Sequence, residues 1–205
     1  MSVVVLISGR GSNLQALLDA DIPVSAVISN VAGAGGLKIA EDRGIPTDTV
    51  PHKDHATREA FEEVLIRAID VHAPRLVVHA GFMRIVTPGY VKHYDGRALN
   101  IHPSLLPSFT GLHTHERALA AGVKLHGCTV HFVTEVLDGG PIVAQAAVPV
   151  RPGDTAQTLA ARVLRQEHYL YPRAVRWFLD GKLELDNGRV FQKDRDAQFV
   201  FSDLP

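Results

Sequence analysis

The sequence predicts an α/β fold with a mostly parallel sheet, and three observations carry this prediction. Runs of branched apolar residues alternate with amphipathic helical segments through the first half of the chain, as in βαβ units. The run at 3–7 shows no polar alternation, which is typical of a parallel strand buried on both faces. Two later strand-like runs, at 126–134 and 142–150, are joined by a turn, so an antiparallel part is expected toward the C-terminus.

Strands and helices alternate regularly in the first hundred residues. Ser12 or Asn13 is expected to cap the first helix, because either side chain can accept a hydrogen bond from the first turn. The helix at 57–72 places apolar residues on one face, which should pack against the sheet. The expected strands are 3–7, 24–29, 75–82 and 97–101, and the expected helices are 12–20, 36–44 and 57–72.

The second half is dominated by one long helix. Asp154 is expected to cap it, and Pro172 should kink or split it because proline removes a backbone donor and clashes with the preceding turn. The tail alternates around Asn187 and Gly188, which is a hairpin signal. The expected elements are a helix at 115–122, strands at 126–134 and 142–150, and the long helix at 154–181.

Length and composition indicate a globular protein with a sizeable core. The chain has 205 residues, of which 46% are hydrophobic and 21% charged. A net charge of -1 gives no field that would attract nucleic acid or an anionic membrane, and no apolar run approaches the roughly 20 residues of a membrane span. Cys128 is the only cysteine, so no internal disulfide is expected. We expect a cytoplasmic monomer or homodimer without nucleic acid or membrane partners.

The glycine loop, residues 8–13 with the sequence SGRGSN, joins the first strand to the first helix. Such a turn exposes backbone N–H groups at the positive end of a helix dipole, and this combination binds phosphate. The dinucleotide fingerprint is incomplete, because Leu14 replaces its third glycine and Ser29–Asn30 replace the acidic residue after the second strand. The loop is therefore either a phosphate site or a tight turn that serves only the fold.

Asn100 and His102 lie where a buried strand ends. Ligands of open α/β sheets bind beyond the carboxyl ends of the strands, and residues two apart on a strand share a face. An amide donor beside an imidazole can stabilise an oxyanion and move a proton. A lone histidine at a strand end can also be an ordinary polar residue, and only the amide beside it favours the catalytic interpretation.

Asp138 precedes two glycines and a proline, so it is either a turn residue or a partner of His102. A carboxylate beside an imidazole favours the charged imidazolium. The sequence alone leaves this choice open. The eleven histidines do not predict a metal site, because there is no H-E-x-x-H motif and no pair of cysteines. Cys128 lies in an apolar strand, which is typical of a packed thiol.

Several segments together resemble the glycinamide ribonucleotide formyltransferases, a branch of the folate-dependent formyltransferase family. The motif Asn-x-His-Pro-Ser-Leu-Leu-Pro at 100–107, with Leu-Asp-x-Gly at 137–140, is shared by several formyl-folate enzymes. The Gly-Ser-Asn part of the glycine loop and GLHTH at 111–115 resemble the ribonucleotide branch. The similar segments are 4–17, 80–86, 99–119, 126–145 and 166–172, which spread across almost the whole chain.

The resemblance implies a fold and a division of the chain. The implied fold is the Rossmann-like, three-layer formyltransferase fold with a mostly parallel twisted sheet and a C-terminal antiparallel part. It implies a single formyltransferase domain over 1–205, with a nucleotide-binding half at about 1–100 and a folate-binding and catalytic half at about 100–190. The tail at 182–205 carries no family motif.

The resemblance also implies a reaction, the transfer of a formyl group from 10-formyltetrahydrofolate to the amine of glycinamide ribonucleotide in de novo purine biosynthesis. The cosubstrate and the ribonucleotide are the only partners implied, and no metal is required. The implied catalytic residues are Asn100, His102 and Asp138. The implied ribonucleotide contacts are Gly11, Ser12, Asn13, Gln166 and Glu167. The implied folate contacts are Arg58, Met83, Arg84, Ile85, Val86, Asn100, Thr134, Glu135, Val136, Leu137 and Asp138.

Other functions remain open on the sequence. The nearest alternatives are a 10-formyltetrahydrofolate hydrolase and a methionyl-tRNA formyltransferase, which by resemblance carry an N-terminal regulatory and a C-terminal RNA-binding domain, respectively. We expect neither domain here. A nucleotide-dependent oxidoreductase is disfavoured by the incomplete fingerprint of the glycine loop. A non-catalytic nucleotide sensor would not need Asn100, His102 and Asp138 together.

Overall fold

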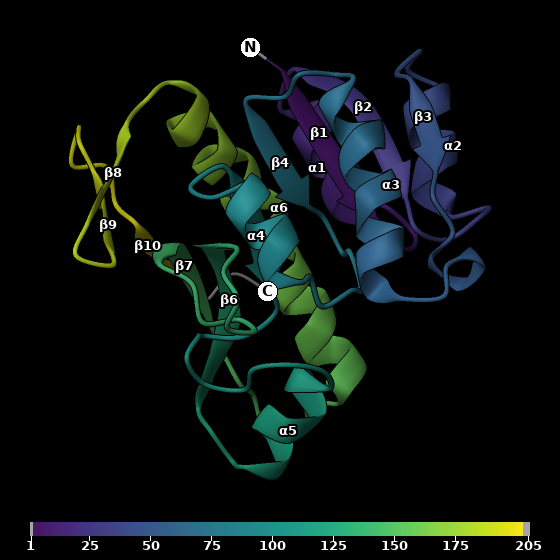
Figure 1. The fold of residues 1–205 in the computed structure, drawn as a ribbon. Helices are drawn as coiled ribbons and strands as arrows, with labels where there is room; N and C mark the ends of the chain where they lie inside the picture. Colours follow the sequence, from purple (N-terminus) through teal and green to yellow (C-terminus); the bar gives the residue numbers. More distant parts are fainter. Residues whose placement is uncertain (1, 203–205) are drawn as a thin grey trace. The chain divides into compact units, whose positions relative to one another are not determined.

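The computed structural model describes residues 2–202 and divides into two compact units (Figure 1). The first unit contains the residues up to 100 together with 133–135. The second contains 101–132 and the residues from 136 onward. The expected single domain over 1–205 stays a prediction.

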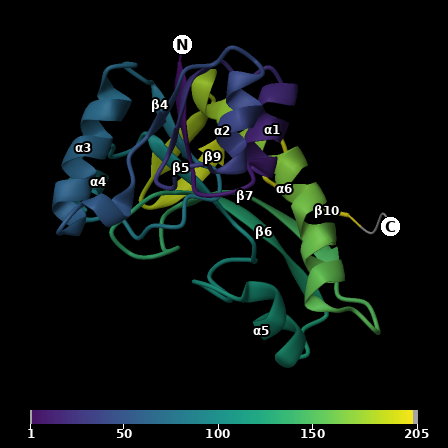
Figure 2. The same cartoon turned by 90° about the vertical axis from the view of Figure 1, so that its right-hand side faces the viewer.

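The first unit is a parallel sheet with helices on both faces. Its strand order is β5-β4-β1-β2-β3, and every neighbouring pair is parallel, as the sequence predicts. Helices α3 and α4 lie on one face of these strands and α1 and α2 on the other (Figure 2). The strands are β1 Val3–Ile7, β2 Val24–Ser29, β3 Thr47–Thr49, β4 Leu76–His79 and β5 Ala98–His102, and the helices are α1 Ser12–Asp19, α2 Gly35–Glu41, α3 Arg58–Asp70 and α4 Pro88–His93.

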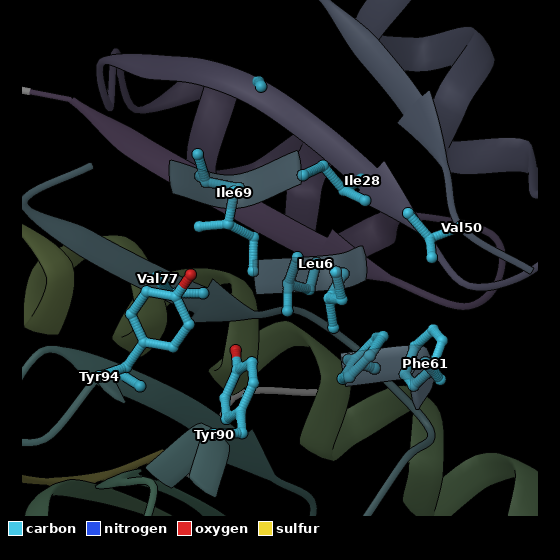
Figure 3. Packing of buried hydrophobic residues seen from close by; sticks show 13 residues of the cluster. Leu6, Ile28, Val50, Phe61, Ile69, Val77, Tyr90 and Tyr94 are labelled. Carbon is cyan, nitrogen blue, oxygen red and sulfur yellow. The ribbon is translucent and has the colours of Figure 1, made fainter. Parts of the chain in front are cut away.

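A hydrophobic core lies between this sheet and helices α3 and α4 (Figure 3). Leu6 and Val77 reach it from neighbouring strands, Phe61 from α3, and Tyr90 and Tyr94 from α4. All five residues are at most 2% exposed. Close packing of this kind fixes the strands beneath the loops that follow them, so the carboxyl ends of β1 and β4 are held in place.

The second unit contains the antiparallel part. Strand β6 pairs antiparallel with β7, which confirms the predicted mixed sheet, and β10 adds to β7 in parallel. A separate hairpin, β8–β9, confirms the turn predicted at Asn187–Gly188. The elements are α5 Thr114–Ala120, β6 Leu125–Phe132, β7 Ile142–Pro149, α6 Ala156–Leu179, β8 Leu183–Asp186, β9 Arg189–Gln192 and β10 Phe199–Phe201.

Both predicted helix caps were wrong. Gly11, in the left-handed region at φ 80°, is the N-cap of α1 and no side chain among the described residues caps that helix, so neither Ser12 nor Asn13 does. Thr155 caps α6 in a reciprocal capping box with Thr158. Asp154 lies one residue earlier and accepts hydrogen bonds from the backbone of Arg151 and the hydroxyl of Thr158.

Helix α6 is not split at Pro172, which lies buried inside it.

The sequence also missed several short elements. Strands β3 and β10 have three residues each, and η1 His52–Asp54 is a single 3₁₀ turn, so their patterns are too short to be read. Helix α4 did carry a signal, because Thr87 is its N-cap and Pro88 its first residue. Among residues 2–202, no helix combines the length and the apolar content needed to cross a bilayer.

Candidate active site

The glycine loop follows β1 and leads into α1, as predicted. A Cβ atom at Gly11 would lie 2.5 Å from the Cα of Gly36, and Gly11 also has φ +80°. The amide of Gly36 donates to the carbonyl of Gly9 at 3.0 Å. Two backbones therefore touch here, and the loop offers main-chain groups at the N-terminus of an eight-residue helix. Gly36 was not among the predicted site residues, although the Gly35–Gly36 pair is a signal of close backbone approach.

The Met83 segment, residues 83–86, follows β4 in the same unit. Met83 is 66% exposed and Ile85 51%, so two large apolar side chains face solvent. The guanidinium of Arg84 lies 6.0 Å from the ring centroid of Phe61. Exposed apolar groups of this kind are suited to an aromatic ligand, because such sites are mostly apolar with a few polar groups that orient the ligand.

Helix α3 anchors the end of this segment. The carboxylate of Glu62 accepts from the backbone N–H of Thr87 at 2.9 Å and also from its hydroxyl. Burial raises the pKa of Glu62, while the hydrogen bonds from Thr87 and the charge of Arg58 oppose that rise. Arg58 begins α3 and is exposed. Thr87, the residue after Val86, is thus held by the buried side chain of Glu62.

His102 and Asp138 meet in the second unit. Nδ1 of His102 lies 3.5 Å from Oδ2 of Asp138, and both side chains are less than 10% exposed. Nε2 of His102 lies 3.0 Å from the carbonyl oxygen of Phe109. Since a carbonyl only accepts, Nε2 must carry a proton, and a second proton on Nδ1 would face the carboxylate. The pair can therefore hold an imidazolium with an acceptor at each N–H group.

Asp138 is held by further contacts. Its Oδ2 accepts from the backbone N–H of Gly111 at 2.7 Å, and its Oδ1 lies 3.9 Å from Nε2 of His131. Nδ1 of His131 donates to the carbonyl of Phe132 at 2.9 Å, and burial lowers the pKa of His131. Neither His131 nor Gly111 was among the predicted site residues, although Gly111 begins the GLHTH motif at 111–115. Asp138 itself has φ +52°, a conformation that Asp and Asn adopt more readily than most residues.

A second histidine pair lies in the same unit. Nδ1 of His115 is 3.2 Å from Nε2 of His126. Burial lowers the pKa of both residues, that of His126 to about 4, and the charge of His102 lowers them further. Burial therefore disfavours a positive charge on either ring.

The remaining predicted residues lie on several elements. Asn100 is half-buried on β5, two residues before His102. Gln166 is half-buried and Glu167 buried on α6. The structure thus brings His102 to Asp138, and the glycine loop and the Met83 segment follow neighbouring strands. The loop residues of this set are Thr134, half-buried, and Glu135, Val136 and Leu137, all exposed.

Two further kinds of chemistry would depend on clustered metal ligands or on an accessible thiol. Among residues 2–202, no group of three or more His, Cys, Asp or Glu side chains is arranged to hold a metal ion. Burial raises the pKa of the Cys128 thiol well above its ordinary value. A buried thiol of this kind packs as a small apolar side chain and is not a nucleophile.

Comparison with known proteins places these features in context. Residues 1–175 match the sequence profile of a family described as "Formyl transferase". A phosphoribosylglycinamide formyltransferase of Escherichia coli (strain K12) is 53% identical over 191 residues, which cover 90% of this chain and 90% of that protein. A trifunctional purine biosynthetic protein adenosine-3 of Bos taurus is 47% identical over 92% of this chain, which is 19% of that protein. The solved phosphoribosylglycinamide formyltransferase of Coxiella burnetii superposes with a TM-score of 0.92 at 47% identity, over 98% of this chain and 99% of that one.

Proposed function

The chain belongs to the formyl transferase family, and we propose that it transfers a formyl group from 10-formyltetrahydrofolate to the amine of glycinamide ribonucleotide, a step of de novo purine biosynthesis. The observation that carries this proposal is the His102–Asp138 pair, two nearly buried side chains at 3.5 Å on a formyl-folate motif. The relatives named phosphoribosylglycinamide formyltransferase support the ribonucleotide as acceptor.

The reaction needs one bond to form and one to break. The amine nitrogen of the ribonucleotide attacks the formyl carbon, whose oxygen becomes an oxyanion in the tetrahedral intermediate. The bond between that carbon and N10 of the folate then breaks, and the proton lost by the amine is delivered to N10. The protein must therefore stabilise one negative oxygen and move one proton.

His102 and Asn100 are assigned to the oxyanion. The N–H at Nε2 of His102 is bound to the carbonyl of Phe109, so it must exchange that acceptor for the oxyanion during the reaction. Asp138 remains near Nδ1, where its carboxylate oxygen can accept from a second ring N–H. The amide of Asn100 supplies a second donor, and losing one such donor typically raises the barrier by roughly 3–4 kcal/mol. Asp138 and His102 then carry the proton toward N10.

Binding is assigned to the two sets of residues named from the sequence. The backbone N–H groups at Gly11, Ser12 and Asn13 hold the ribonucleotide phosphate, because the N-terminus of α1 has no side-chain cap. Gln166 and Glu167 contact the ribose. The folate is assigned to Arg58, Met83, Arg84, Ile85, Val86, Asn100, Thr134, Glu135, Val136, Leu137 and Asp138.

One assay tests this function against the alternatives. Purified protein is mixed with 10-formyltetrahydrofolate and glycinamide ribonucleotide, and the absorbance of the deformylated folate is followed. We expect turnover that depends on both substrates, with formylglycinamide ribonucleotide as the product. The same assay without ribonucleotide is the control: steady release of formate there would indicate a hydrolase. Turnover only with methionyl-tRNA as acceptor would identify the other formyltransferase branch.

A further inference from the structure

The glycine loop and the Met83 segment are connected by one side chain, that of Ser8. The backbone N–H of Met83 donates to Oγ of Ser8 at 2.7 Å, and the Ser8 hydroxyl donates to Oδ1 of Asn30 at 2.6 Å. An amide N–H can only donate, so the direction of the first bond is fixed and the single hydroxyl proton must go to Asn30. The hydroxyl thus links residues that follow three different strands.

These three strands are neighbours in the sheet of the first unit. Ser8 follows β1, Asn30 follows β2, and Met83 follows β4 by four residues, in the order β4-β1-β2. Backbone hydrogen bonds continue the pairing just past the strands, from Ser8 N to the Gly81 carbonyl at 3.1 Å. Asn30 is 2% exposed, so its side chain is a fixed partner that holds the hydroxyl in one orientation. The same asparagine stands where the dinucleotide fingerprint has an acidic residue.

Ser8 does not act on a ligand through its proton, because Asn30 already accepts it. Its effect must pass through the main chain of the two segments it joins. A ligand that orders the glycine loop also orders Ser8, and with it the N–H of Met83. The second ligand then finds its segment partly ordered and loses less conformational entropy on binding.

We propose that Ser8 is a positioning residue that couples the binding of the two substrates. This inference rests on the proposed function, because it assigns the phosphate to the glycine loop and the folate to the Met83 segment. Coupling is reciprocal: the ribonucleotide should tighten folate binding by the same factor as folate tightens ribonucleotide binding. Asn30 is the second residue needed for this coupling, since it sets the orientation of the Ser8 hydroxyl.

The test measures this factor directly. Isothermal calorimetry gives the Kd of 5,8-dideazafolate, which carries no formyl group, with and without saturating glycinamide ribonucleotide. In the wild-type protein we expect the ribonucleotide to lower this Kd. Ser8→Ala should reduce the coupling factor by roughly three- to tenfold, the range expected for the net loss of one hydrogen bond. Ser8→Thr retains the hydroxyl and should restore most of the factor.

Ser25→Ala is the matched control. Ser25 lies on β2 of the same unit and donates to the carbonyl of Val3 at 3.2 Å, away from both segments. Its loss should lower stability without changing the coupling factor. An equal coupling factor in wild type and Ser8→Ala overturns the proposal, and so does a fall as large in Ser25→Ala.

A measurement on the wild-type protein covers the case in which Ser8→Ala does not fold. Amide hydrogen exchange should slow at Met83 when glycinamide ribonucleotide alone is added, because ordering the glycine loop strengthens the bond from Met83 to Ser8. An unchanged exchange rate at Met83 overturns the coupling. If the wild-type protein binds neither ligand, the proposed function fails and this inference with it. Binding of both ligands without coupling overturns the inference alone.

Discussion

The glycine loop and the His102–Asp138 pair are built from different materials. The loop presents main-chain groups, and the backbones of Gly11 and Gly36 come so close that neither position has room for a Cβ atom. The pair consists of two nearly buried side chains whose hydrogen bonds go to the backbone of Phe109 and Gly111. The glycine loop depends on glycines, which have no side chain beyond a hydrogen atom. The His102–Asp138 pair depends on two ionisable side chains.

This difference determines how each region can fail. Adding atoms should damage the loop, because its conformation and its contact with Gly36 leave no room for a Cβ atom at Gly11. Removing charge should damage the pair, because its shape can survive a change from carboxylate to amide. The five predictions below test this contrast and extend it to other residues, beginning with the largest expected effect.

Asp138→Asn should lower kcat by about 10²–10⁴-fold, the usual contribution of general acid–base catalysis. Asparagine tolerates the φ of +52° at this position and can keep a hydrogen bond from Gly111, but it removes the negative charge beside His102. The fold and both substrate affinities should persist, which is the pattern of an interaction made mainly in the transition state. Steady-state kinetics measures kcat and the two KM values, and thermal unfolding shows whether the fold persists.

The opposite outcome identifies Asp138 as an ordinary turn residue. In that case the variant would lose thermal stability and keep kcat close to the wild-type value. Such a result would remove the contrast between the two regions, since both would then act through backbone shape alone.

Gly11→Val should lower the free energy of unfolding by about 3 kcal/mol, from the left-handed φ and the clash with Gly36 together. Gly9→Ala is the matched variant in the same loop, because a Cβ atom there meets nothing within 4 Å and φ is not positive. It should leave stability unchanged and raise the KM for the ribonucleotide severalfold. Chemical denaturation and the two KM values, measured side by side, separate the effects. An increased folate KM in Gly9→Ala, with the ribonucleotide KM unchanged, would show that the loop is misassigned.

The sequence predicted the features that depend on local patterns. The βαβ alternation, the antiparallel β6–β7 pair and the β8–β9 hairpin all follow from apolar periodicity and turn residues, and all are confirmed. The glycine loop was found for the same reason, as a run of small residues between a strand and a helix.

The features that were missed depend on contacts between distant residues or on single-residue choices. Asp154 and Thr155 are both good capping residues, and only the start of the helix decides between them. Gly11 replaces a polar cap because the loop must pass close to Gly36, which lies 25 residues away in the chain. The hydroxyl of Ser8 acquires its two partners only when three strands lie side by side.

Asp154→Asn should lower the free energy of unfolding by about 2 kcal/mol, the usual range for a hydrogen bond to a charged group, without changing kcat. Asp154 and Arg162 form a bidentate pair at 2.7 and 2.8 Å with side chains 5% and 9% exposed. This carboxylate is saturated by an arginine, whereas that of Asp138 faces two histidines. Comparing Asp154→Asn with Asp138→Asn shows whether a nearly buried carboxylate supports kcat only when its partners are histidines and not an arginine.

The same pair gives a pH dependence. The hydrogen bonds from Arg162 hold the pKa of Asp154 well below its ordinary value. A depressed folded-state pKa stabilises the protein above the unfolded-state value of about 3.9, and this stabilisation is lost as the pH falls below it. The difference in unfolding free energy between wild type and Asp154→Asn should therefore be constant from pH 7 to pH 5 and shrink toward pH 3. A difference that grows on acidification would contradict the ion pair as its source.

Arg58→Gln should have the smallest effect, a rise of roughly three- to fivefold in the KM for the formyl donor, since exposed charge pairs contribute at most about 1 kcal/mol. Arg58 is exposed at the start of α3, one turn before the Glu62 that holds Thr87. Arg67→Gln, an exposed arginine in the last turn of the same helix, is the matched control and should leave that KM unchanged. The effect of Arg58→Gln should also diminish at high salt, because an exposed charge acting on an anionic ligand is screened. Equal KM values for the two variants would make Arg58 an ordinary solvated helix charge, and the folate would then be held by the Met83 segment without its help.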